Sequence, residues 1–177
     1  EENRKAWAKL WESRVRIIGA SEEWQDVVDA SFFYLYSTVS PSSPQSMAPF
    51  GLSRRDEYKG HVFWDTESFM FMLPLFTDPS SAKAMLDYRF NRLEAARHNA
   101  MINGYNGIQF PWQSGATGDE VTRASASEAG EVHVNMDVVL AFIAYFQVSG
   151  DEVFMRERAW PVVKGVAEWI ESRVTKT

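Results

Sequence analysis

The segment from Asp78 to Gly104 restricts the fold more than any other part of the sequence. Asp78 is a residue type that caps helices, Pro79 fits a first helical turn, and glycine, as at position 104, often ends a helix. Between them, a set of mostly small or apolar side chains recurs every three or four positions: Ala82, Met85, Arg89, Leu93, Ala96 and Ala100. This spacing predicts one long helix with a single buried face.

A second helix is expected earlier in the chain, with Ser21 as its N-cap. Its buried stripe is predicted to consist of apolar side chains at intervals of three or four: Trp24, Val28, Phe32, Leu35 and Val39. A stripe of this length indicates a helix of roughly five turns. The Ser- and Pro-rich stretch 41–46 that follows is expected to be a loop.

Two more helices are expected towards the C-terminus. One begins near Val134 and ends at Gly150, and the other is capped by Asp151 and interrupted near Pro161. The first of them carries an apolar stripe along one side: Val139, Phe142, Ile143 and Phe146. Alternating strand patterns are missing almost everywhere, although residues 14–18 fit a short extended segment. The sequence therefore predicts an all-α fold.

Two long loops, residues 51–65 and 104–131, separate the expected helices. Loops of this length in a compact domain are usually functional or disordered, and the aromatic content of these two argues against disorder. A helical array with elaborated loops is typical of α/α-barrels and α-solenoids, which build binding sites at the loop face. The two loops are therefore the expected place of a binding site.

Charge and composition exclude several partners and sites. The net charge of −6, with scattered Lys and Arg, argues against nucleic acid, and the absence of a long apolar run argues against a membrane-spanning helix. The chain has no cysteine, which excludes disulfides, thiolate nucleophiles and Cys-based metal sites. Residues 1–4 resemble neither a signal peptide nor an initiator start, so we expect the natural protein to begin earlier, and the cytoplasm is favoured.

The first chemically rich motif is Gly60–Glu67, in which a loop leads into a helix through Trp64 and Asp65. A pyranose has apolar faces on which an indole can stack, and its neighbouring hydroxyls can both donate to one carboxylate. His61 belongs to the same motif. The alternative is a tryptophan in the core beside an aspartate that caps a helix.

The second motif lies in residues 110–120, where Trp112, Gln113 and Glu120 stand among glycines. A Gln side chain both donates and accepts hydrogen bonds, as sugar hydroxyls do, although such a loop could also merely turn the chain. The third motif places His133 and Asn135 at alternate positions beside an acid. The histidine spacing matches no zinc pattern, so no metal is expected.

Hydrolysis of a glycoside needs two carboxyl groups, one to protonate the leaving oxygen and one to activate water. The motifs offer four candidates: Asp65, Glu67, Asp119 and Glu120. Spacing alone assigns a role to none of them.

In order and spacing, residues 60–67, 111–120 and 131–135 resemble the landmarks of glycoside hydrolase family 65. That family includes maltose, kojibiose and trehalose phosphorylases, acid trehalases and the glucosidase that acts on glucosylgalactosyl-hydroxylysine of collagen. The resemblance implies part of an (α/α)6 barrel and inversion at the anomeric carbon of an α-glucoside.

The resemblance also implies roles for single residues. Trp64 and Asp65 match the pair that holds the non-reducing glucose, and Asp65 is the candidate for an essential residue. The other implied substrate-binding residues are Trp112, Gln113, Glu120, His61, His133 and Asn135. The family's general acid is a Glu in a Pro-Asp-Glu-Tyr motif expected downstream of Thr177, so no residue of this chain is certain to be catalytic.

Length supports the same interpretation, because twelve helices of ~12 residues with ~5-residue connections need roughly 200 residues. We therefore expect residues 1–177 to be a single-domain fragment, the first half of a barrel. It consists of a leading segment (1–20) and helical hairpins with sugar-binding loops 51–67 and 104–135. The isolated fragment is expected to expose apolar helix faces and to be inactive.

Three functions follow from this interpretation. The first is an inverting hydrolase of trehalose-like or glucosyl-galactosyl α-glucosides, and the second is an inverting disaccharide phosphorylase. The third is a non-catalytic helical carbohydrate-binding protein. No cofactor is expected, except inorganic phosphate as co-substrate of a phosphorylase. The expected partners are an α-glucoside di- or oligosaccharide, the remainder of the catalytic domain and, as a homodimer, a second copy.

Overall fold

The computed structural model describes residues 1–52, 58–122 and 130–174, and their regular secondary structure is helical. The helices in chain order are α1 (Glu2–Trp11), α2 (Glu22–Tyr36), the π-helical turn η1 (Thr66–Met70), α3 (Met72–Thr77), α4 (Pro79–Phe90), α5 (Leu93–Ile102), α7 (His133–Ser149), α8 (Glu152–Phe154), the π-helical turn η2 (Met155–Ala159) and α9 (Trp160–Val174). The predicted all-α class is confirmed. No helix in this part of the chain is both long and apolar enough to cross a membrane.

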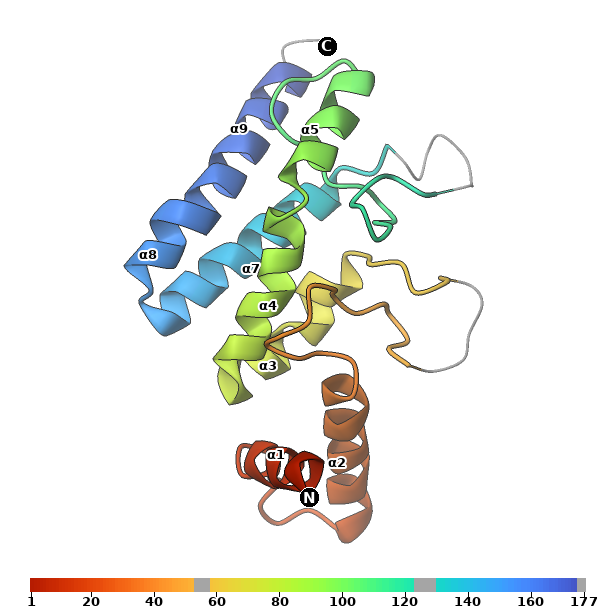
Figure 1. Ribbon diagram of the computed structural model, residues 1–177, viewed down its shortest axis with the longest axis vertical. Helices are drawn as coiled ribbons and strands as arrows, with labels where there is room; N and C mark the ends of the chain where they lie inside the picture. The colour runs from red at the N-terminus through yellow and green to blue at the C-terminus, as the bar shows by residue number, and fades with distance from the viewer. Residues whose placement is uncertain (53–57, 123–129, 175–177) are drawn as a thin grey trace.

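The helices form an elongated body with the two chain ends at opposite ends (Figure 1). Helix α5 continues α4 in nearly the same direction, α7 packs across α4 and η1, and α9 returns alongside α5 (Figure 1). Residues 108 and 109 lie between α5 and α9, because Ile108 N–H donates to Gly165 O (3.0 Å) and Gln109 N–H donates to Ala96 O (2.9 Å). A Cβ atom on Gly107 would lie 2.2 Å from Gly165 O, so this approach requires glycine.

The core gathers around α7, whose side chains meet those of α3, α4, α8 and α9. Its fully enclosed members are large and apolar: Leu75, Met85, Leu86, Val138, Phe142, Phe154, Val162 and Val166. Helices α1 and α2 join this core mainly through Phe32 and Tyr36 near the C-terminal end of α2. The better-packed half of the molecule is therefore the one that supports the two long loops.

The long helix predicted from Asp78 to Gly104 is two helices. All six residues of its predicted stripe are buried, but the helix breaks at Arg92, whose backbone (φ −115°, ψ 20°) leaves helical geometry. The Arg92 guanidinium lies 3.8 Å from the centroid of the Tyr88 ring and donates to Ala116 O at 2.8 Å. The break therefore places a side chain that anchors the second long loop.

The predicted stripe of the second helix is only partly right. Phe32 is buried, but Trp24 is 64% exposed and Val39 lies beyond the helix, which ends at Tyr36. The N-terminal half of α2 projects from the body together with α1, so little chain covers Trp24 (Figure 1). Ser21 occupies the N-cap position, but its side chain makes no capping hydrogen bond.

The prediction for the third helix has the right ends and the wrong face. Helix α7 begins at His133 and ends at Gly150 in the left-handed region (φ 65°), as predicted. Of the predicted stripe only Phe142 is buried, and the buried face comprises Val134, Asn135, Val138, Ala141, Phe142 and Tyr145. The helix is apolar on several sides, so its spacing could not select one face.

The last two predictions concern local geometry. Asp151 caps its helix as predicted by accepting from Phe154 N–H at 2.8 Å, and the interruption before Pro161 is the π-helical turn η2. Residues 14–18 form no strand, because the Gln25 side chain accepts from Ile17 N–H and donates to Val15 O in place of a partner strand.

Candidate functional site

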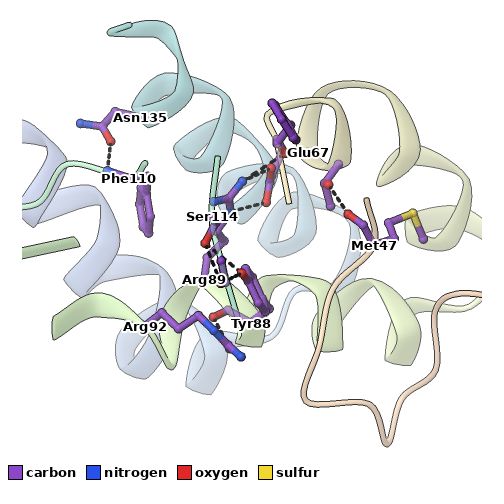
Figure 2. A network of polar contacts seen from close by, with 11 residues as sticks. Met47, Glu67, Tyr88, Arg89, Arg92, Phe110, Ser114 and Asn135 are labelled. Atoms are coloured by element: carbon purple, nitrogen blue, oxygen red, sulfur yellow. Dashed lines mark hydrogen bonds and ion pairs between the residues drawn. The ribbon is translucent and has the colours of Figure 1, made fainter. Parts of the chain in front are cut away.

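The two long loops lie on one side of the helical body and are joined directly to each other (Figure 1). Val62 and Ser114 form an antiparallel pair in which Val62 N–H donates to Ser114 O (3.0 Å) and Ser114 N–H donates to Val62 O (2.8 Å). From α4, the Tyr88 hydroxyl donates to Gly115 O (2.7 Å) and lies 2.8 Å from Ser114 Oγ (Figure 2). The first two sequence motifs are therefore neighbours with a rigid support beneath them.

Three rings from the three motifs form one aromatic cluster. The His133 ring lies edge to face with Trp64 (centroids 4.8 Å apart, 85°) and with Trp112 (5.6 Å, 84°). All three side chains are half-buried, so each retains an accessible surface. Position 133 is the first residue of α7, and the helix start thus brings the third motif to the other two.

A second link between the loops is polar. His61 Nδ1 lies 3.0 Å from Gln113 Oε1, and both residues are half-buried. Because the Gln oxygen can only accept, His61 Nδ1 carries the proton in this contact. The Gln113 amide N–H2 group then remains as a donor beside the cluster.

Asp65 is the one carboxylate of the first motif without a partner among the described residues. It precedes η1 in the N-cap position, yet its side chain makes no capping hydrogen bond, and it is half-buried. The alternative that Asp65 serves as a helix cap therefore has no hydrogen bond to support it. Its oxygens are available to a ligand that donates hydrogen bonds.

Glu67 has the opposite environment. Its carboxylate is 2% exposed and receives two hydrogen bonds from Arg89, Nε to Oε1 at 2.8 Å and Nη2 to Oε2 at 3.0 Å. Arg89 Nη2 also donates to Phe63 O at 3.1 Å (Figure 2). The guanidinium therefore holds the backbone before residues 64–65 and the Glu67 side chain after them. The Glu67 carboxylate is engaged in this structural ion pair.

The surroundings of Arg89 keep it charged. Burial lowers the pKa of the guanidinium, but the ion pair with Glu67, with a smaller contribution from the charge of Asp137, outweighs this. The pKa of Arg89 consequently lies above its ordinary value. A buried cation at this position requires a partner of opposite charge, and Glu67 is that partner.

Glu120 acts as the clamp of the second loop. Its carboxylate accepts from the backbone N–H groups of Trp112 (2.6 Å), Gln113 (3.1 Å) and Thr122 (3.0 Å) and from the Thr122 hydroxyl (2.6 Å). These four bonds occupy most of the lone-pair directions of the two oxygens. The role of Glu120 visible in the structure is thus to hold Trp112 and Gln113 in place.

Asn135 lies in the core, not on the accessible face of the cluster. It is 2% exposed, its Oδ1 accepts from Phe110 N–H at 2.7 Å and its Nδ2 donates to Ile108 O at 3.1 Å (Figure 2). Asn135 therefore fixes the chain that leads into the second motif. The fourth candidate carboxylate, Asp119, is exposed and accepts from the Thr117 hydroxyl at 2.5 Å.

Comparison with known proteins assigns this arrangement to a family. A family model described as the glycosyl hydrolase family 65 central catalytic domain matches residues 29–177. The chain belongs to glycoside hydrolase family 65.

Relatives with different reactions match almost the whole chain. The chain is 43% identical to a kojibiose hydrolase of Flavobacterium johnsoniae over 96% of its length, 35% identical to a protein-glucosylgalactosylhydroxylysine glucosidase of Gallus gallus over 96%, and 36% identical to a kojibiose phosphorylase of Halothermothrix orenii over 98%. It spans about a quarter of these relatives: 25%, 26% and 24% of their lengths, respectively.

The fold comparison agrees with the family. A solved structure described as a kojibiose phosphorylase from the human microbiome superposes with a TM-score of 0.85 over 97% of this chain and 24% of that one, at 22% sequence identity. At this identity the likeness concerns the fold alone. The chain is part of an (α/α)6 barrel, as predicted.

Two cavities in the described part of this family 65 chain lie away from the motif cluster. One of about 1100 Å³ lies between α1, residues 36–43 and the start of α4, and one of about 340 Å³ lies between α5 and α9. Neither of these two contains Trp64, Asp65 or Trp112, all of which are half-buried. Within the described ranges, no group of three His, Asp or Glu side chains is arranged to hold a metal ion.

Some residues that build the site escaped the sequence motifs. Tyr88 of α4 and Arg92 at the break between α4 and α5 support the second loop, and Asp137 accepts from His133 Nδ1 at 2.7 Å. Arg89 had a visible signal, since an arginine in an otherwise small and apolar stripe implies a buried partner of opposite charge. Asp137 also had one, because it lies one helical turn after His133.

Proposed function

We propose that this chain supplies the glucose-binding part of an inverting α-glucoside hydrolase. One observation carries the proposal: Trp64 and Trp112 flank His133 from separate loops, while the neighbouring Asp65 carboxylate has no partner among the described residues. Aromatic faces suit the apolar faces of a pyranose, and a free carboxylate suits its donating hydroxyls.

The polar groups at the cluster support a hexose over an anion or an apolar ligand. Asp65 offers hydrogen-bond acceptors, and Gln113 offers donors beside His61. These groups can therefore both accept hydrogen bonds from sugar hydroxyls and donate to them. The names of the relatives support a disaccharide in which glucose is α-linked, and two relatives, 43% and 36% identical, are kojibiose hydrolases. Kojibiose is therefore the first substrate to test, followed by a glucosyl-galactosyl glycoside.

The general acid of the reaction is proposed to lie outside these 177 residues. Of the four candidate carboxylates, Glu67 is buried in an ion pair, Glu120 is taken up by four hydrogen bonds and Asp119 is exposed beside Thr117. Asp65 alone is left, and hydrolysis with inversion needs two carboxyl groups. We expect the 177-residue chain to show no turnover, whereas the longer parent protein hydrolyses the glycoside.

The experiment follows kojibiose cleavage by the parent protein with and without inorganic phosphate. The hydrolase predicts release of the non-reducing glucose as its β-anomer at a rate that phosphate does not change. Nuclear magnetic resonance taken within the first minutes reports this as an excess of β-glucose over the anomeric mixture of the reducing-end glucose. Cleavage by the 177-residue chain alone would contradict the proposal, and so would an early excess of the α-anomer over the amount that the reducing-end glucose contributes.

An inverting phosphorylase is the second candidate, because relatives named kojibiose phosphorylase match 94–98% of the chain at 32–36% identity. In that case phosphate replaces water as the nucleophile, and each kojibiose yields one glucose 1-phosphate and one glucose in place of two glucose molecules. The same assay separates the two functions, since cleavage would then depend on phosphate.

A further inference from the structure

His133 is held by a carboxylate that none of the motifs includes. His133 Nδ1 lies 2.7 Å from Asp137 Oδ2, one turn further along α7, with side-chain exposures of 39% and 19%. An ionised carboxylate only accepts hydrogen bonds, so the proton of this contact belongs to Nδ1. In the neutral imidazole the other nitrogen, Nε2, is then an unprotonated acceptor.

The ring of His133 is fixed from two more sides. Trp64 and Trp112 each meet it edge to face, so the ring has little freedom to flip while Nδ1 is bonded to Asp137. Within the described residues, Nε2 has no hydrogen-bond partner. A half-exposed ring between two indoles thus retains one polar atom for a ligand.

We propose that Asp137 is a positioning residue of the sugar site: it holds His133 in the Nδ1-protonated form, so that Nε2 accepts a hydrogen bond from a hydroxyl of the bound hexose. The inference rests on the proposed function. It adds to the carboxylate of Asp65, at the end of the first loop, a second acceptor at the start of α7.

The kinetic test is Asp137→Ala in the parent protein. Without its acceptor, Nδ1 no longer fixes the tautomer, and the neutral ring can place its proton on Nε2, which then cannot accept. We expect kcat/KM for the α-glucoside to fall about tenfold, mainly through KM, which is the size of one lost hydrogen bond. The matched control is Asp87→Ala, which removes a carboxylate of similar exposure that pairs with Lys83 and Arg158, and which should leave kcat/KM unchanged.

A spectroscopic test reads the tautomer directly and does not depend on sugar binding. In the parent protein with ¹⁵N-labelled histidine, the shifts of His133 at neutral pH should show a protonated Nδ1 and an unprotonated Nε2. The resonances are assigned by their loss in His133→Gln. This wild-type measurement stands even where Asp137→Ala fails to fold, and a protonated Nε2 in the wild type overturns the inference.

Parallel kinetics of Asp65→Asn separate this inference from the function on which it rests. Impaired Asp65→Asn with normal Asp137→Ala overturns the role of Asp137 and leaves the glucose site intact. Normal kinetics in both variants would overturn the proposed glucose site and, with it, the role of Asp137. Impairment of both variants, together with the expected tautomer, supports both.

Discussion

Asp65 and Glu67 lie in one short segment, and their carboxylates have opposite surroundings. Glu67 is 2% exposed and forms two hydrogen bonds with the buried Arg89. Asp65 is half-buried and has no hydrogen bond or ion pair among the described residues. The difference arises from direction: Glu67 points to Arg89 of α4 in the core, whereas the Asp65 carboxylate meets no such partner.

The contrast shows how this segment combines stability with binding. The Arg89 guanidinium bonds to Phe63 O and to Glu67, so it fixes the chain immediately before and after Trp64 and Asp65. A charge that is neutralised inside the protein can order the backbone but cannot bind a ligand. A charge left without a partner contributes little to folding and remains available to a sugar.

Loss of the buried counter-charge should have the largest effect. In Glu67→Gln, Arg89 stays charged and buried without an ionic partner, which should destabilise the protein by about 3–5 kcal/mol. Urea unfolding followed by tryptophan fluorescence measures this change. The control is Glu94→Gln, which breaks the exposed pair with Arg97 and should cost less than about 1 kcal/mol. Equal effects of the two variants would show that the buried pair has no special role.

Glu120, which holds the second loop, should have the next largest effect on stability. Glu120→Ala removes four hydrogen bonds and leaves the N–H groups of Trp112 and Gln113 without their acceptor, which should cost about 2 kcal/mol. Sugar affinity should fall as well, since these two residues lose their fixed position. Asp119→Ala, at the neighbouring exposed carboxylate, is the control and should change stability by less than about 0.5 kcal/mol. If Glu120→Ala changed neither the free energy of unfolding nor the sugar affinity, Glu120 would not be the residue that holds the second loop.

The smallest change in stability is expected at Asp65. Asp65→Asn keeps the size of the side chain and breaks no hydrogen bond of the described residues, so the free energy of unfolding should change by less than about 0.5 kcal/mol. The same urea experiment measures it. Asn caps helices about as well as Asp, so the cap role is tested by Asp65→Ala, in which a loss above about 1 kcal/mol would return Asp65 to the role of a helix cap.

The sequence predicted the helical class and the helix ends at residues 150 and 151 because those features depend on local residues. Asp151 and Gly150 mark their ends through side-chain and backbone chemistry within a few residues. It failed where packing decides, as at the exposed Trp24 and on α7, which is apolar on several faces. In local sequence, neither Trp24 nor the exposed side of α7 can be distinguished from a core position.

The motifs of the site were visible in the sequence. Which of their residues face the accessible side and which hold the backbone was not. Glu120 and Asn135 stand in the same motifs as Trp112 and His133, yet the structure turns their polar atoms to backbone groups. Such contacts join residues of separate segments, and no spacing rule predicts them. Spacing likewise could not decide which of the two carboxylates in Gly60–Glu67 is buried.

The most direct test is the affinity of the parent protein for glucose, measured by isothermal titration calorimetry for the wild type and Asp65→Asn. Charged hydrogen bonds contribute about 1.5–3 kcal/mol, so the variant should bind glucose roughly 10- to 100-fold more weakly while its unfolding midpoint stays unchanged. Equal affinity in the two proteins would contradict the claim that Asp65, with the aromatic cluster, holds a hexose.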